Sequence, residues 1–261
     1  MRRTTRQRLV RGIFYALFVV IVAAVLLAAD WPAIKQNFLD PEVAAQNWPA
    51  IITVAAKNTV IYTFIAFIVG LVAGLALALM KLSTVGPYRW LATVYIEFFR
   101  GLPALVVIIA FAVSVPIAFS WRPPGGPLGA GLVGLSVVAA AYMAETIRAG
   151  IQAVPKGQFE ASRSLGMSGF WTTVSVVLPQ AFRIIIPPLT NELVVLIKDT
   201  SLLFVVGMAV GQRELTTFSR DGLVTYGNST PLLMAAVMYL VITLPLTRLV
   251  AYMERRTQAA R

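Results

Sequence analysis

Long apolar runs, separated by short polar or charged segments, decide what this chain can fold into. A helix needs about 20 apolar residues to cross the hydrocarbon core of a bilayer. With 58% hydrophobic and 13% charged residues among 261, the chain carries more apolar surface than an ordinary soluble domain can bury. The runs lack the alternating pattern of a membrane β-barrel. We therefore expect an all-α, polytopic membrane protein with six spans, near residues 12–30, 52–80, 90–119, 129–150, 178–209 and 231–252.

Two of these runs exceed one simple crossing, so we expect tilt or a break in them. The chain also divides into three parts. Residues 1–50 form a basic N-terminus, a first span and an outer loop. Residues 51–254 form the main transmembrane domain, and residues 255–261 a cytoplasmic tail. The first span looks like a signal sequence, but Asp30-Trp31-Pro32 is a poor cleavage site, so we expect it to stay uncleaved.

The basic residues cluster at the ends of the apolar runs and predict the orientation. Lys and Arg near span ends favour the cytoplasm, which explains the net charge of +11 better than nucleic-acid binding does. Both termini and the loops after the second and fourth spans are predicted inside, in the cell membrane. The residues on which this depends are Arg2, Arg3, Arg6, Arg8, Arg11, Lys81, Arg89, Lys156, Arg163, Arg248, Arg255, Arg256 and Arg261.

The composition also limits the chemistry. Cys and His are both absent, which removes disulfides, Cys/His metal sites, thiol nucleophiles and imidazole bases. Neither the phosphate-binding GxxxxGK[ST] nor the nucleophile motif GxSxG occurs. We expect no catalytic residue, no metal site and no cofactor bound by this chain.

A polar loop at about residues 151–177 separates the fourth and fifth spans and needs an aqueous partner. Residues 158–165 can form a short helix, with Glu160 in its first turn and Gly166 ending it. Ser168 can cap a second helix that runs toward Pro179. The side chains expected to project from this loop toward a partner are Phe159, Ala161, Leu165 and Phe170. An amphipathic loop that merely lies on lipid is the alternative.

The motifs of this region resemble those of a known family. Glu160-Ala161-Ser162, then Gly166 and the run VVLP at 176–179, are similar to the EAA loop of ABC importer permeases. The segments AYMAETIRAGIQAVPKGQ, PPLTNELVVLIKDTSL and YIEFFRGLP, with Asn58-Thr59, resemble the polar amino acid permeases of the histidine, glutamine, glutamate and arginine types. Related chains often have Thr-Pro and a later glutamine where this one has Leu102-Pro103 and Val107.

The resemblance implies a five-helix type I importer core plus one N-terminal helix, with the loop as a cytoplasmic coupling helix. It implies that a separate ATPase subunit binds ATP and Mg, that a second permease chain (identical or different) completes the pathway, and that an external binding protein delivers an amino acid. The implied ATPase-coupling residues are Gln158, Phe159, Glu160, Ala161, Ser162, Leu165, Gly166 and Phe170.

Ionisable residues inside spans are costly and are candidates for function. Glu97 with Arg100, and Glu145 with Arg148, stand at i,i+3 and can neutralise each other; we interpret the second pair as structural. Pro187-Pro188 is expected to interrupt the fifth span. A zwitterionic amino acid needs a cation and an acid, and the candidate substrate-pathway residues are Glu97, Arg100, Glu192, Lys198, Asp199, Thr200 and Ser201.

Two other classes of protein would leave different signs in the sequence. A secondary transporter or channel would run without ATP and would show internal repeats or its own ion site, and no convincing repeat is present. A membrane enzyme would cluster its acids at a bilayer surface, which this sequence does not do.

Overall fold

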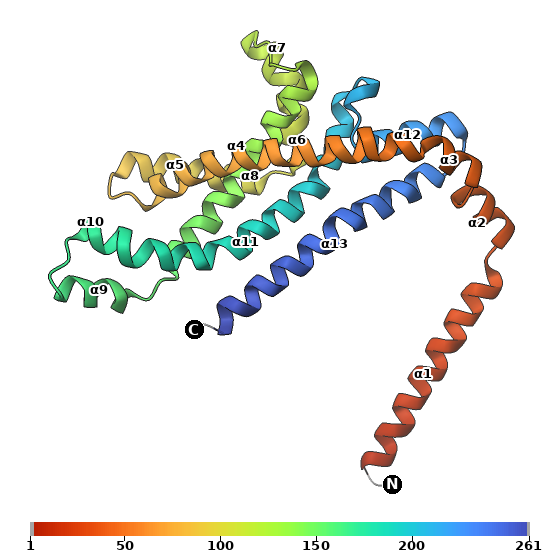
Figure 1. Cartoon of the computed structure of the whole chain (residues 1–261), viewed down its shortest axis with the longest axis horizontal. Helices are drawn as coiled ribbons and strands as arrows, with labels where there is room; N and C mark the ends of the chain where they lie inside the picture. The colour runs from red at the N-terminus through yellow and green to blue at the C-terminus, as the bar shows by residue number, and fades with distance from the viewer. Residues whose placement is uncertain (1–2, 260–261) are drawn as a thin grey trace.

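The computed structural model describes residues 3–259 as a set of helices, with no strand among them (Figure 1). Met1, Arg2, Ala260 and Arg261, which include parts of the predicted N-terminus and tail, lie outside the described residues. The α-helices are α1 (Arg3–Ala28), α2 (Trp31–Phe38), α3 (Pro41–Ala50), α4 (Lys57–Leu82), α5 (Gly86–Gly101), α6 (Ala104–Ile109), α7 (Val115–Phe119), α8 (Gly126–Gln152), α9 (Lys156–Ser164), α10 (Gly169–Thr172), α11 (Leu178–Asp199), α12 (Leu215–Tyr226) and α13 (Thr230–Ala259). Shorter π and 3-10 segments join them: η1 (Ile51–Ala56), η2 (Ala110–Ser114), η3 (Thr173–Val177), η4 (Thr200–Val206) and η5 (Val210–Gln212).

Four of the described helices are long and apolar enough to cross a membrane, at Val10–Ala28, Trp31–Leu82, Gly126–Gln152 and Thr230–Arg256. A fifth candidate is a bent pair, in which α5 and the α6–α7 unit meet at 107°. This bend lies within the predicted span 90–119 and confirms that the long run is broken. The break falls at Leu102-Pro103, where both residues have extended backbone angles, because proline disfavours a helical residue before it.

The predicted interruption at Pro187-Pro188 is wrong. Both prolines lie inside α11, which runs as one helix from Leu178 to Asp199. Proline removes a backbone donor and usually kinks a helix, but α11 packs along α8 and α13, and these contacts hold it together. The change in helix type comes later, at Thr200, where α11 passes into the 3-10 segment η4.

The first helix stands apart from the rest of the molecule. In Figure 1, α1 projects away from the bundle with the N-terminus at its far end. No residue in the apolar stretch Val10–Ala28 is buried. Its apolar surface is therefore available to lipid, as expected for a span that lies outside the main domain.

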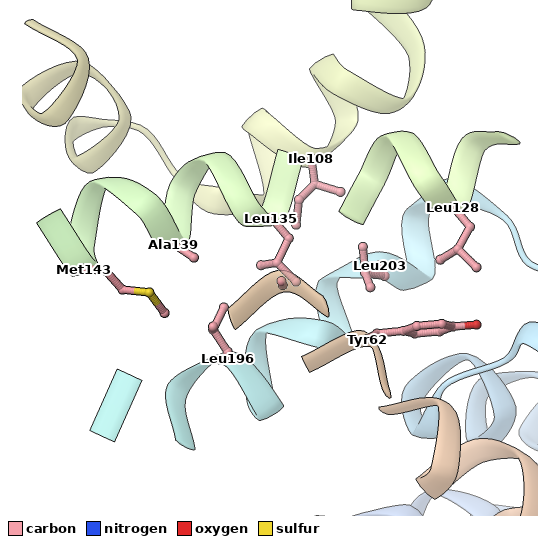
Figure 2. Close-up of a cluster of buried hydrophobic side chains, with 9 residues drawn as sticks. Tyr62, Ile108, Leu128, Leu135, Ala139, Met143, Leu196 and Leu203 are labelled. Carbon is pink, nitrogen blue, oxygen red and sulfur yellow. The ribbon is translucent and has the colours of Figure 1, made fainter. Parts of the chain in front are cut away.

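The core forms where α4 crosses α8, which is the most extensive helix contact. One buried cluster draws side chains from α4, α6, α8, α11 and η4 (Figure 2). Its labelled members are Tyr62, Ile108, Leu128, Leu135, Ala139, Met143, Leu196 and Leu203. A second cluster lies toward the α9 end and includes Ile96, Ile147 and Ile185.

Gly70 and Gly74 on α4 make this close approach possible, as their spacing predicts. A Cβ at Gly70 would lie 2.9 Å from the Cβ of Ala139, and one at Gly74 would lie 3.0 Å from the carbonyl oxygen of Ala140. Both glycines are buried. The GxxxG therefore serves helix packing.

Replacing Gly74 by leucine should lower the free energy of unfolding by about 2 kcal/mol or more, because the larger side chain would force α4 and α8 apart. Gly12→Leu is the matched control, since Gly12 lies in α1 with no atom within 4 Å of the added Cβ. Both changes improve helix propensity equally. Thermal unfolding of the detergent-solubilised protein measures the difference, and equal stability of the two variants would contradict this packing.

Candidate functional site

The loop between α8 and α11 folds as a helix–turn–helix. Its first helix, α9, spans Lys156–Ser164, close to the predicted 158–165. Gly166 follows with φ of +86°, a left-handed conformation that glycine adopts without strain. Ser168 then caps α10, and its hydroxyl accepts a hydrogen bond from the Trp171 amide at 3.4 Å. From α10 the chain continues through η3 into α11, so the loop is attached directly to a long helix.

Large apolar side chains of this loop are exposed on the surface of the chain. Leu165 is 85% exposed and Phe170 is 69% exposed. Phe159 and Trp171 are exposed as well. Figure 1 shows α9 and α10 side by side at one extremity of the molecule. Exposed apolar groups gathered on a polar loop are typical of a surface that binds another protein or a membrane.

Two details differ from the sequence prediction. Glu160 lies beyond the first turn of α9, which contains no acid, because the helix begins at Lys156. Ser162 is buried, and its hydroxyl donates to the carbonyl oxygens of Gln158 and Phe159 at 2.8 and 2.9 Å. Ser162 therefore lies on the inner face of α9, while its neighbour Ala161 is exposed.

The base of the loop is tied to α11 beside a cavity of about 1060 Å³. The Gln180 amide donates to the Gln158 side chain at 3.3 Å and to the Val176 carbonyl at 2.9 Å. The cavity is lined by the end of α8, the start of α9, α11 and α13. These contacts connect the base of α9 to the start of α11.

Glu145 of α8 connects two helices, α4 and α8, near the start of the loop. Its carboxylate accepts hydrogen bonds from both Arg148 and Lys81, the latter at 3.3 Å. Arg148 also donates to Gln152, one turn nearer the loop. The predicted pair of Glu145 and Arg148 is confirmed. Lys81 of α4 was missed, because the sequence presented it only as a topology signal.

Glu145→Gln should destabilise the protein by about 1–3 kcal/mol, since two cations would lose their carboxylate partner at a half-buried site. Glu254→Gln is the control: it removes a charge of the same kind from an exposed position on α13. Thermal unfolding of both variants measures the effect. An equal shift in the two would show that the three-way contact contributes nothing specific.

Three of the predicted pathway residues, Arg100, Glu192 and Asp199, lie near one another where α5 and α11 pack on α8. Arg100 lies over the ring of Tyr142, with its guanidinium carbon 5.5 Å from the ring centroid. Glu192 lies within electrostatic reach of both Asp199 and Arg100. Glu192 and Asp199 are half-buried, while Arg100 and Lys198 are exposed. Two half-buried acids and a cation–π pair thus share one region.

The predicted ion pair between Glu97 and Arg100 is wrong. No ion pair joins them in the described part of the chain, because Arg100 turns toward Tyr142. Glu97 and Lys198 are both exposed. Thr200 is buried and its hydroxyl donates to the Ile197 carbonyl at 2.6 Å, while Ser201 is half-buried in η4. Tyr142 was missed, since nothing in its spacing distinguishes it from a lipid-facing tyrosine.

A third polar region lies near the start of α12 and was also missed. Glu214 is fully buried and caps this helix, accepting from the amides of Thr216 and Thr217 at 2.6 Å each. Burial raises the pKa of its carboxyl above the ordinary range, and the hydrogen bonds from Thr217 and Thr216 act in the opposite direction. In the sequence, Glu214 is only an isolated acid between two apolar runs.

The sequence profile of a known family matches residues 70–259, from the middle of α4 to the end of α13. That family is described as the inner membrane component of binding-protein-dependent transport systems. The chain belongs to this family. It is therefore a multi-pass membrane protein and the permease subunit of a binding-protein-dependent ABC importer. Residues 1–69, with α1 and the start of α4, lie outside the match.

Curated relatives resemble the permease over most of their length. The probable glutamine ABC transporter permease protein GlnM of Bacillus subtilis is 37% identical over 201 residues, which cover 77% of this chain and 90% of the relative. The glutamate/aspartate import permease protein GltK of Escherichia coli is 37% identical, covering 75% and 88%. The L-cystine transport system permease protein TcyB of Bacillus subtilis is 35% identical, covering 88% and 92%.

Solved structures agree with this family. An amino acid ABC transporter crystallised with histidines contains a chain 37% identical to the permease, with a TM-score of 0.73, covering 81% of this chain and 96% of that one. A chain of the MetNI methionine ABC transporter shares the fold at 21% identity, with a TM-score of 0.63, covering 83% and 98%. The fold is thus that of a type I ABC importer permease.

Proposed function

We propose that this permease carries a polar amino acid into the cell, using ATP that a separate subunit hydrolyses. The relatives are named for glutamine, glutamate or aspartate, and cystine, all of them amino acids. The half-buried acids Glu192 and Asp199 suit the ammonium group of such a substrate, and Arg100 suits its carboxylate. We place the substrate between α5, α8 and α11.

The helix–turn–helix of α9 and α10 is the proposed docking element for a cytoplasmic ATPase. The observation that supports this most is its exposure: Leu165 and Phe170 leave large apolar groups in solvent on an otherwise polar loop. A protein groove would remove that surface from water. In this scheme the partner binds ATP and Mg and catalyses hydrolysis, and the permease catalyses no reaction.

The arrangement in the membrane follows from the loop. If α9 and α10 are cytoplasmic, both termini are cytoplasmic when α1, α4, the α5–α7 unit, α8, α11 and α13 each cross once. α11 contains the ionisable residues Glu192, Lys198 and Asp199, and we assign them to the protein-lined pathway, where ionisable groups are tolerated. A second permease chain, identical or different, would form the other wall, and an external binding protein would deliver the amino acid.

The test is substrate-stimulated ATP hydrolysis by the purified complex of permease, ATPase and binding protein. We expect hydrolysis to rise severalfold with one or a few of the common amino acids and to stay at its basal rate with the rest. No stimulation by any amino acid would rule out this substrate class. Failure of the permease to bind any ABC ATPase would rule out the docking role.

A further inference from the structure

Three side chains at the start of α4 hold a distant backbone segment, residues 210–215. The Asn58 amide donates to the carbonyl oxygens of Gly211 and Arg213 at 2.9 and 3.1 Å. Thr59 accepts from the Leu215 amide at 3.1 Å, and the Tyr62 hydroxyl donates to the Gln212 carbonyl at 2.8 Å. We call Asn58, Thr59 and Tyr62 the latch. All hydrogen bonds of the latch to this segment are made to backbone atoms. The latch therefore fixes the backbone of residues 210–215 independently of the side chains in that segment.

The held segment connects two parts of the molecule with different roles. On one side, η4 follows directly from Asp199, at the end of the proposed pathway helix α11. Gly207, with φ of +73°, then turns the chain toward the segment. On the other side α12 begins at Leu215. In Figure 1, α12 lies at the end of the molecule opposite α9 and α10.

A second junction joins the same two parts. The Tyr239 hydroxyl of α13 lies 3.3 Å from the Glu214 carboxylate and 3.1 Å from the Thr216 hydroxyl. It also interacts with the side chain of Thr200 in η4. The start of α12 and the end of the pathway helix therefore meet at one tyrosine.

We propose that the latch closes the outer end of the pathway, and that it must release the 210–215 segment in each transport cycle. Asn58, Thr59 and Tyr62 are positioning residues in this scheme, because they act through the segment and α12. The proposal rests on the proposed function, in whose membrane arrangement α12 follows the crossing of α11 and so lies on the outer side. Its physical basis is that each lost hydrogen bond shifts a two-state equilibrium by about twofold to tenfold.

A reversible cross-link tests the release directly, since the chain has no native cysteine. We would introduce Asn58→Cys with Gly211→Cys and reconstitute the full complex from cysteine-free partners. Oxidation should reduce amino acid uptake by at least about tenfold and remove stimulation by the binding protein, and a reductant should restore both. Undiminished uptake by the cross-linked protein would overturn the proposal, as would failure of the two cysteines to cross-link.

A milder change tests the direction of the effect. Thr59→Val should raise ATP hydrolysis in the absence of binding protein by about twofold to tenfold, because the outer end opens more readily. Thr59→Ser should restore the wild-type rate. Thr63→Val is the matched control: Thr63 is also buried, one turn along α4, but donates only to the Thr59 carbonyl within its own helix. Equal rates for Thr59→Val and Thr63→Val would contradict the latch.

Failure of the proposed function and failure of the latch give different results. A wild-type complex without binding-protein-stimulated hydrolysis would remove the proposed function itself. A wild-type complex that is stimulated normally, with variants and cross-link that change nothing, would remove only the latch.

Discussion

Phe170→Ala should weaken attachment of the ATPase subunit about thirtyfold. Phe170 is 69% exposed at the tip of the helix–turn–helix, and truncation of a central apolar anchor commonly costs about 2 kcal/mol of binding free energy. The affinity of the detergent-solubilised permease for its purified ATPase measures this. Uptake should fall in parallel, since a detached ATPase cannot drive transport.

The matched control is Phe119→Ala at the opposite side of the molecule. Phe119 is 77% exposed, at the end of α7, so it presents the same ring with similar exposure. Its replacement should leave ATPase affinity unchanged within about twofold. If the two variants bind equally well, α10 is not part of the docking surface.

Replacing Asp199 or Arg100 by alanine should reduce amino acid uptake by about tenfold to a hundredfold while leaving ATPase binding intact. In the proposed pathway each change removes one charged partner for the substrate, and such hydrogen bonds contribute about 1.5–3 kcal/mol. Uptake into proteoliposomes and ATPase affinity are measured on the same preparations. Loss of uptake with retained affinity separates the pathway from the loop.

Arg89→Ala is the control for Arg100→Ala, because Arg89 is an exposed arginine near the start of the same helix, α5. It should transport at nearly the wild-type rate. Unchanged rate and substrate affinity in both the Arg100 and Asp199 variants would end the assignment of these residues to the pathway.

Local features of the fold were predictable because they depend on neighbouring residues. The turn of the loop follows from Gly166 and the cap at Ser168, and the break after α5 follows from Leu102-Pro103. The predicted interruption at Pro187-Pro188 was wrong because whether the helix breaks there depends on distant residues. The contacts of α11 with α8 and α13 override the local preference of proline, and no local pattern reveals them.

Several of the missed contacts join residues that are far apart in the sequence. Lys81 reaches Glu145 from another helix, and Tyr142 meets Arg100 only because α5 packs on α8. Asn58-Thr59 was noticed as part of a resemblance, but its partners lie more than 150 residues away. Spacing rules on one helix predict i,i+3 and i,i+4 neighbours. They carry no information on which helices meet.

The most direct measurement is amino acid accumulation in sealed proteoliposomes. Three preparations are compared: the permease alone, the permease with its ATPase, and both of these with the binding protein. In the third preparation, ATP is supplied either inside or outside the vesicles. We expect accumulation only in the complete system with ATP on the side of α9 and α10. Accumulation by the permease alone, or equally well without ATP, would contradict a pathway whose opening is driven by a nucleotide-binding partner.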